Sequence, residues 1–117
     1  MNHSFKSNCL STAYDFEIAI RDIHPGEQLT DDYGYLNIST PFKAANEGTK
    51  RKMVYPDDLE KYYPEWDKKL EENFPKIPKV SQPLAPLLSK NVQKEIDAVL
   101  AGKKPLASIL ELYYKPK

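Results

Sequence analysis

The sequence predicts an α+β fold in which short β-strands in residues 1–36 are followed by a C-terminal α-helical segment. Apolar and polar residues alternate from Phe16 to Arg21, and a Pro25-Gly26 turn follows. After Tyr55 the spacing of apolar residues changes from two to three or four. A period of two is typical of half-buried strands, whereas a period of three to four is typical of amphipathic helices.

The 117 residues suffice for one small domain with a single core. The 17 basic and 17 acidic residues cancel, so charge does not indicate a phosphate-backbone partner, and we expect no direct nucleic-acid binding. No apolar run approaches the roughly 18 residues that span a bilayer, and the N-terminus lacks a signal-peptide layout. We therefore expect a soluble intracellular protein without a membrane partner.

The single cysteine, Cys9, excludes an internal disulfide and a zinc site built from several thiolates. We interpret Cys9 as a small buried residue rather than a reactive thiol. No metal is expected.

Short strands are expected near Cys9-Leu10, over residues 16–20 and at Leu29-Thr30. The last of these leads to Tyr33, which we expect at a strand end. Gly34 follows Tyr33, and we expect its role to be the backbone freedom that glycine provides at this point of the chain.

Residues 37–52 are mostly polar or basic and predict an exposed loop. The chain then divides into two expected units, residues 1–54 and a helical extension over residues 55–117. A helix is expected to begin near Pro56-Asp57. Its apolar stripe comprises Leu59, Tyr62, Tyr63, Trp66 and Leu70. Pro64 inside this stripe predicts a kink or two short helices.

Four prolines in residues 74–88 predict an extended connector. A second helix is expected over residues 89–101, with Ser89 as its N-cap and Gly102 as its end. A third is expected over residues 105–113, which would form a helical hairpin with the second.

Two segments carry a family resemblance. Asn2-His3-Ser4 matches an Asn-His-Ser signature, and Glu27 to Gly34 matches Glu-x-Leu-Thr-x-Asp-Tyr-Gly. Together and in this order, they resemble the C-terminal half of the SET domain, the catalytic fold of one class of protein lysine methyltransferases. The strands of residues 1–36 would then be part of a SET-like β fold.

The resemblance implies S-adenosylmethionine as cofactor and a protein lysine as substrate. It implies that Tyr33 is the catalytic tyrosine and that Asn2 and His3 contact the cofactor. It also implies that Tyr35 is an aromatic neighbour that can line the lysine channel. Asp32 is expected to anchor the backbone around the tyrosine.

The sequence departs from the family pattern in three places. It contains no Gly-x-Gly segment, so we expect the chain to begin within the domain. Residues 42–52 stand where many relatives have a cysteine-rich zinc segment and contain no cysteine, which implies a zinc-free relative. In such a relative, Phe42 and Trp66 could cover adenine. For Trp66, however, packing on its own helical stripe is the favoured interpretation. Asp31 stands where the family often has an aromatic residue.

Three hypotheses follow. The first is the C-terminal portion of a SET-domain lysine methyltransferase, impaired or inactive as this isolated chain. The second is a non-catalytic interaction module that docks a partner on the stripes at Leu59/Trp66/Leu70 and Ile109/Tyr113. A third is a homodimer in which two incomplete sheets associate through unpaired edges.

Overall fold

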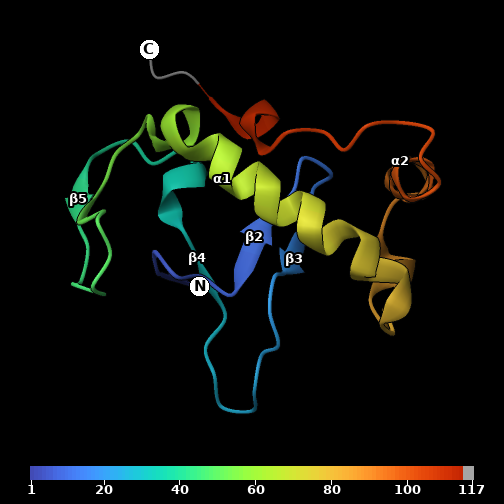
Figure 1. Cartoon of the computed structure of the whole chain (residues 1–117), viewed down its shortest axis with the longest axis horizontal. Coiled ribbons are helices and arrows are strands. Elements are labelled where there is room, and N and C mark those ends of the chain that lie inside the picture. Colours follow the sequence, from blue (N-terminus) through green and yellow to red (C-terminus); the bar gives the residue numbers. More distant parts are fainter. Residues whose placement is uncertain (115–117) are drawn as a thin grey trace.

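The computed structural model describes residues 1–114, and the predicted α+β class is confirmed. The body is flattened, with extents of 39 × 38 × 23 Å. Helix α1 crosses the molecule, with the N-terminal strands on one side and the C-terminal segment on the other (Figure 1). The strands are β1 (Asn2–His3), β2 (Cys9–Ser11), β3 (Glu17–Ala19), β4 (Thr30–Asp31), β5 (Phe42–Lys43) and β6 (Met53–Val54). The helices are α1 (Asp58–Asn73), α2 (Lys90–Leu100) and the 3-10 helices η1 (Tyr33–Tyr35), η2 (Phe74–Lys79), η3 (Ala85–Leu87) and η4 (Ile109–Leu112).

The strands form three two-stranded sheets. β1 and β4 are parallel, so that His3 lies opposite Asp31 although 26 residues, 4–29, lie between the two strands. β2 pairs antiparallel with β3, and β5 pairs antiparallel with β6. The strands expected near Cys9 and over residues 16–20 are therefore confirmed. Cys9 is buried, as predicted.

Asn8 fixes the position of β4 against the first strands. Its side chain is 1% exposed; Oδ1 accepts a hydrogen bond from the Thr30 N–H at 2.9 Å, and Nδ2 donates to the Gln28 carbonyl at 2.7 Å. A buried amide that bonds to backbone on both sides specifies one arrangement of the two segments.

One core joins the N-terminal strands to the helical segment. Its buried members are Leu10, Tyr35, Leu59, Trp66, Leu70 and Ile109. A second cluster centres on Tyr14, Phe74 and Ile96. Burial of these apolar side chains is the main driving force that holds α1 against the strands.

Helix α1 continues through Pro64, so the alternative of two short helices is wrong. Proline cannot donate a hydrogen bond to the carbonyl four residues earlier, at Glu60. Both Pro64 and Glu60 are exposed, so water can satisfy that carbonyl. Burial of the stripe on the opposite face, including Leu59 and Leu70, outweighs the lost hydrogen bond.

Two segments predicted to be irregular contain regular structure. Residues 37–52 are not simply an exposed loop, because Phe42 and Lys43 pair with β6. Residues 74–88 are not extended, because η2 and η3 occupy much of them. The fixed φ of proline also suits a 3-10 helix, which explains how a proline-rich segment can coil.

Helix α2 is confirmed with its predicted cap, since Ser89 Oγ accepts from the Val92 N–H at 3.1 Å. The third helix and the helical hairpin are wrong: only η4 forms between residues 105 and 113. Backbone N–H groups that a helix would need bond instead to side chains that are distant in sequence. The Ala107 N–H donates to the Tyr14 hydroxyl at 2.8 Å, and the Ile109 N–H donates to Asp67 Oδ1 at 2.8 Å.

No helix within residues 1–114 is both long enough and apolar enough to cross a membrane.

Replacing Asp67 with alanine should lower the free energy of unfolding by about 2 kcal/mol, because the buried Ile109 amide then loses its acceptor. The Ser108 hydroxyl, 2.6 Å from Asp67 Oδ2, loses its acceptor as well. Urea unfolding followed by circular dichroism measures the change. Glu71→Ala, at an exposed position of the same helix, is the control. Equal stability of the two variants would contradict this role of Asp67.

Candidate functional site

The parallel pairing of β1 with β4 brings the two sequence signatures together. The Tyr33 N–H donates to His3 Nδ1 at 3.0 Å, and the two ring centroids lie 5.4 Å apart. The Tyr33 hydroxyl donates to the backbone carbonyl of Met1. Tyr33 lies in η1, two residues after the end of β4, rather than in the strand itself. The tyrosine and the Asn2-His3 segment are thus neighbours.

Aromatic rings surround His3. The centroids of Phe5 and Phe42 lie 4.5 and 5.6 Å from that of His3, both in edge-on arrangements, and Phe42 also lies 6.1 Å from Tyr33. Because Nδ1 accepts a hydrogen bond, a neutral His3 carries its proton on Nε2. Nε2 is buried and has no hydrogen-bond partner among residues 1–114. We call His3, Phe5, Tyr33 and Phe42 the aromatic cluster.

The electrostatics of the cluster favour neutral His3. Burial lowers the pKa of His3 below its usual 6.5, and this effect outweighs the nearby carboxylates of Asp32 and Glu47, which act to raise it. Neutral His3 is the form that can accept the Tyr33 N–H.

Asn2 lies at the exposed edge of the site. Its Nδ2 donates to Gln28 Oε1 at 2.9 Å in a solvent-exposed pair. The Asn2 amide is therefore accessible to a ligand beside the cluster.

Tyr35 lies in the core and is 1% exposed. Its hydroxyl lies 2.5 Å from Asp31 Oδ1, and it accepts the Asp32 N–H at 3.1 Å. Burial, followed by the hydrogen bond and charge of Asp31, raises the pKa of Tyr35. The Tyr35 ring packs edge-on against Trp66, with centroids 5.2 Å apart. Asp31 thus takes part in a buried polar contact next to the core, and the role of Tyr35 in a lysine channel stays a prediction.

Asp32 anchors the turn that carries Tyr33, as expected. Its Oδ1 accepts from the Gly34 N–H at 2.8 Å, and its carboxylate pairs with Arg51. Gly34 is required for space rather than for an unusual backbone angle. A Cβ on Gly34 would lie 2.8 Å from Arg51 Nη2 and 3.0 Å from both Asp32 Oδ1 and Asp58 Cβ.

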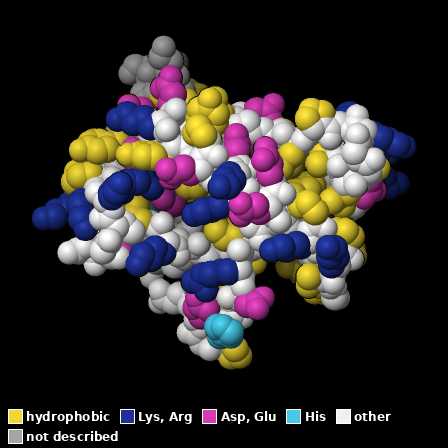
Figure 2. Space-filling model, viewed as in Figure 1, with side chains coloured by type: hydrophobic (Ala, Val, Ile, Leu, Met, Phe, Trp, Pro, Cys, Tyr) yellow, Lys and Arg dark blue, Asp and Glu magenta, His cyan; other side chains and the backbone are white. Residues whose placement is uncertain are grey.

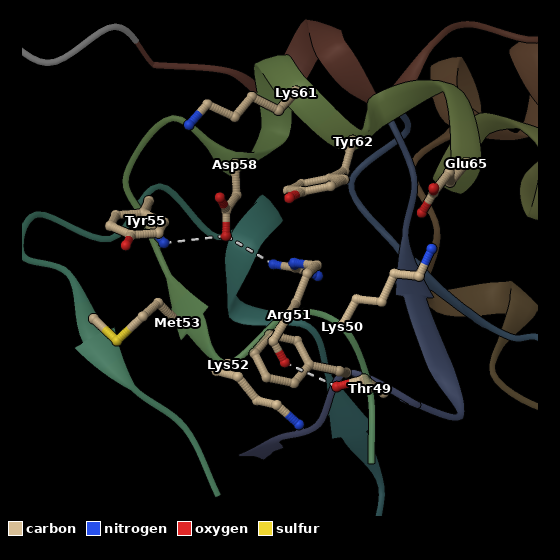
Figure 3. Close-up of a pocket in the computed structure, with 11 residues that line it drawn as sticks. Thr49, Lys50, Arg51, Lys52, Met53, Tyr55, Asp58, Lys61, Tyr62 and Glu65 are labelled. Carbon is tan, nitrogen blue, oxygen red and sulfur yellow. Dashed lines mark hydrogen bonds and ion pairs between the residues drawn. The ribbon is translucent and has the colours of Figure 1, made fainter. Parts of the chain in front are cut away.

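Arg51 connects three parts of the chain. Its guanidinium pairs with Asp32 and, at 2.7 Å, with Asp58 at the start of α1. It also lies 4.6 Å from the ring centroids of both Phe5 and Tyr62. Burial alone would lower the pKa of Arg51, but the two aspartates outweigh burial and raise it. Figure 3 shows the guanidinium directed at Asp58 and near Tyr62. We call Arg51, Asp32 and Asp58 the arginine clamp.

Glu47 holds the segment after β5 against the Asn2-His3-Ser4 signature. Its carboxylate accepts from the Ser4 hydroxyl at 2.6 Å and from the Phe5 N–H at 2.9 Å. These hydrogen bonds outweigh burial and lower the pKa of Glu47. Sequence reasoning missed Glu47 and Arg51, because long-range contacts of 42 and 19 residues leave no local pattern.

The two aromatic residues considered as an adenine cover lie in different places. Phe42 belongs to the aromatic cluster. Trp66 is 5% exposed within the core and packs on Tyr35 and Tyr62, as its helical stripe predicts.

Comparison with known families bears on this geometry. Residues 1–34 match the SET domain family model. The match includes Asn2, His3 and Tyr33 and ends at Gly34, so residues 35–117 lie outside it. No curated protein and no solved structure matches the chain. The SET match thus indicates a relationship to the SET domain for residues 1–34. It gives no information about α1, α2 or the arginine clamp.

Among the described residues, no group of three or more His, Cys, Asp or Glu side chains is placed to hold a metal ion.

Replacing Arg51 with methionine should lower the free energy of unfolding by about 3 kcal/mol, because Asp32 and Asp58 are then left buried without their counter-charge. Lys50→Met removes an exposed neighbouring charge and should change stability little. Urea unfolding of both variants measures the difference. Similar losses in both variants would contradict the clamp.

A second prediction concerns pH. The folded-state pKa of His3 is below 6.5, so the unfolded chain binds more protons between the two values. The stability contributed by His3 is therefore full above pH 6.5 and is lost as pH falls through the folded-state pKa. His3→Asn keeps an acceptor for Tyr33 but cannot titrate, so this part of the pH dependence should disappear.

The measurement is the free energy of unfolding as a function of pH. Glu17 acts oppositely in an overlapping range, because burial and Asp31 raise its pKa from 4.5 to about 7. Glu17 is present in both proteins, so the difference between the two curves isolates His3. His24→Asn, at an exposed position, should reproduce the original curve. Parallel curves for the original protein and His3→Asn would refute the assignment.

Proposed function

We propose that this chain is the C-terminal portion of a SET-domain methyltransferase, and that its site transfers a methyl group from S-adenosylmethionine to a protein lysine. The observation that carries the proposal is the contact between the two signatures, with Tyr33 N–H bonded to His3 Nδ1 at 3.0 Å. The SET match over the same residues supports it.

The described residues fit one side of such a cofactor. Asn2 offers an exposed amide, and His3 has a buried Nε2 without a hydrogen-bond partner in residues 1–114. The rings of Tyr33 and Phe42 present π-electron density, which attracts a sulfonium cation. Asn2 and His3 would hold the cofactor. When bound, S-adenosylmethionine supplies an electrophilic methyl group.

The role of Tyr33 in this proposal is positioning close to the reacting atoms. Its hydroxyl is held by the Met1 carbonyl and can orient a lysine amine. The half-buried rings around it withhold water from the amine, which favours the neutral, nucleophilic form of lysine. His3 fixes the backbone of Tyr33, and Asp32 fixes the following glycine.

We propose further that the isolated chain is impaired, because its 117 residues contain no Gly-x-Gly segment to complete the cofactor site. No zinc-dependent closure of the site is proposed, because residues 42–52 contain no cysteine. Tyr35 remains a proposed neighbour of the lysine channel.

The interaction-module alternative is less well supported. Leu59, Trp66, Leu70 and Ile109, which motivated it, are buried in the core of the chain itself. The homodimer remains a proposal. It would use the edge of β3 that has no strand partner among the described residues, and a purely monomeric sedimentation profile would count against it.

Titration of S-adenosylmethionine followed by NMR tests the cofactor site. Weak binding is expected, with shifts at the amides of Asn2, His3 and Tyr33 and none in α2. Asn2→Ala should lower the affinity about tenfold through the loss of a hydrogen bond to a charged ligand. Asn91→Ala, exposed on α2, should leave the affinity unchanged.

Two results would contradict the proposal. Shifts confined to other parts of the chain would refute the cofactor site. Tight binding together with rapid lysine methylation would support methyl transfer but contradict the proposed impairment of the 117-residue chain.

A further inference from the structure

A groove of about 570 Å³ lies between the segment Thr49–Tyr55 and the first two turns of α1. This volume is within the range of binding sites for small ligands and peptide side chains. The groove is not lined by Asn2, His3 or Tyr33. It adjoins the aromatic cluster through Phe5, which lines the groove and contacts His3.

The charges that an incoming ligand would meet are mainly positive. Lys50, Lys52 and Lys61 line the groove and are exposed, whereas Glu65 is the exposed acidic residue in its lining. Figure 3 shows Lys61 on one side of the groove and Lys50 and Lys52 on the other. In Figure 2 basic side chains lie near β5 and the start of α1, and others are spread over the same face with acidic side chains among them.

The remaining charges of the lining already have partners. Asp58 accepts from Arg51 at 2.7 Å and from the Tyr55 N–H at 3.0 Å. Arg51 is shared between Asp58 and Asp32. Two of the lysines have weaker interactions than Arg51 has. Lys61 lies 3.5 Å from Asp57 at the surface, and Lys52 donates to the Asn46 side chain at 2.8 Å. Exposed contacts of this kind contribute little free energy, so the carboxylate of a ligand can replace them.

Apolar surface accompanies these lysines. Met53 and the ring of Tyr55 line the groove, and Tyr55 is 41% exposed. Such a combination suits a chain in which carboxylates alternate with apolar side chains. A phosphate backbone is less well matched, because the one arginine fork in the groove is occupied by two aspartates, and separated lysines act as single point charges.

We propose that this groove binds an acidic, extended segment of a partner polypeptide, with carboxylates at Lys50, Lys52 and Lys61 and an apolar side chain on Tyr55 and Met53. The site is distinct from that of the proposed methyl transfer and does not depend on it. A partner bound here would lie beside the aromatic cluster.

Fluorescence anisotropy with a short labelled peptide in which Glu alternates with Leu tests the proposal. The peptide should bind, and its Gln/Leu counterpart should not. Replacing Lys50, Lys52 and Lys61 with glutamine should weaken binding about tenfold, and raising the ionic strength should weaken it as well. The matched control replaces Lys90, Lys94 and Lys103 with glutamine. These lysines are exposed and lie outside the groove, so the control should change the affinity less than about twofold.

The lysines are exposed, so both triple variants should fold, and their thermal unfolding midpoints verify this. The single change Lys61→Glu provides a second variant and should also weaken binding. The proposal is overturned if the acidic peptide does not bind, if both triple variants bind equally, or if a single-stranded oligonucleotide binds through the same lysines while the acidic peptide does not.

Discussion

The arginine clamp is the interaction on which the arrangement of the site depends. Arg51 joins Asp32, which anchors the turn carrying Tyr33, to Asp58 at the first turn of α1. Phe5 and Tyr62 enclose the guanidinium, so a planar cation satisfies two carboxylates and two rings at once. The ammonium group of lysine has no comparable planar set of donors. The clamp therefore connects the SET-matched residues to a helix that lies outside the match.

The clamp operates together with two further restraints. Asn8 holds β4 through its buried amide, and Glu47 holds the segment that follows β1. Each restraint joins segments at least 20 residues apart, and each ends within a few residues of the His3–Tyr33 contact. The cluster around His3 is thus positioned from several sides by polar contacts, while the core beneath α1 supplies most of the burial.

This arrangement places two chemically different regions side by side. The aromatic cluster is rich in π-electron density and favours a neutral His3. The neighbouring groove presents exposed lysines. Phe5 belongs to both, since it contacts His3 on one side and Arg51 on the other. A partner held in the groove would consequently be close to the residues proposed to receive the cofactor.

The sequence by itself determined the fold class, strands β2 and β3 and the capped helix α2, and it singled out Asn2, His3 and Tyr33 through their two signatures. These features depend on local periodicity, on a cap three residues from its donor, or on contiguous signatures. Only the tertiary structure decided that α1 continues through Pro64, that residues 105–113 form only a short 3-10 helix, and that Tyr35 enters the core. It also decided that Gly34 is needed for space beside Arg51. The physical reason is the same in each case: partners distant in sequence supply the burial or the hydrogen bonds, and their free energy exceeds the local preference of the chain.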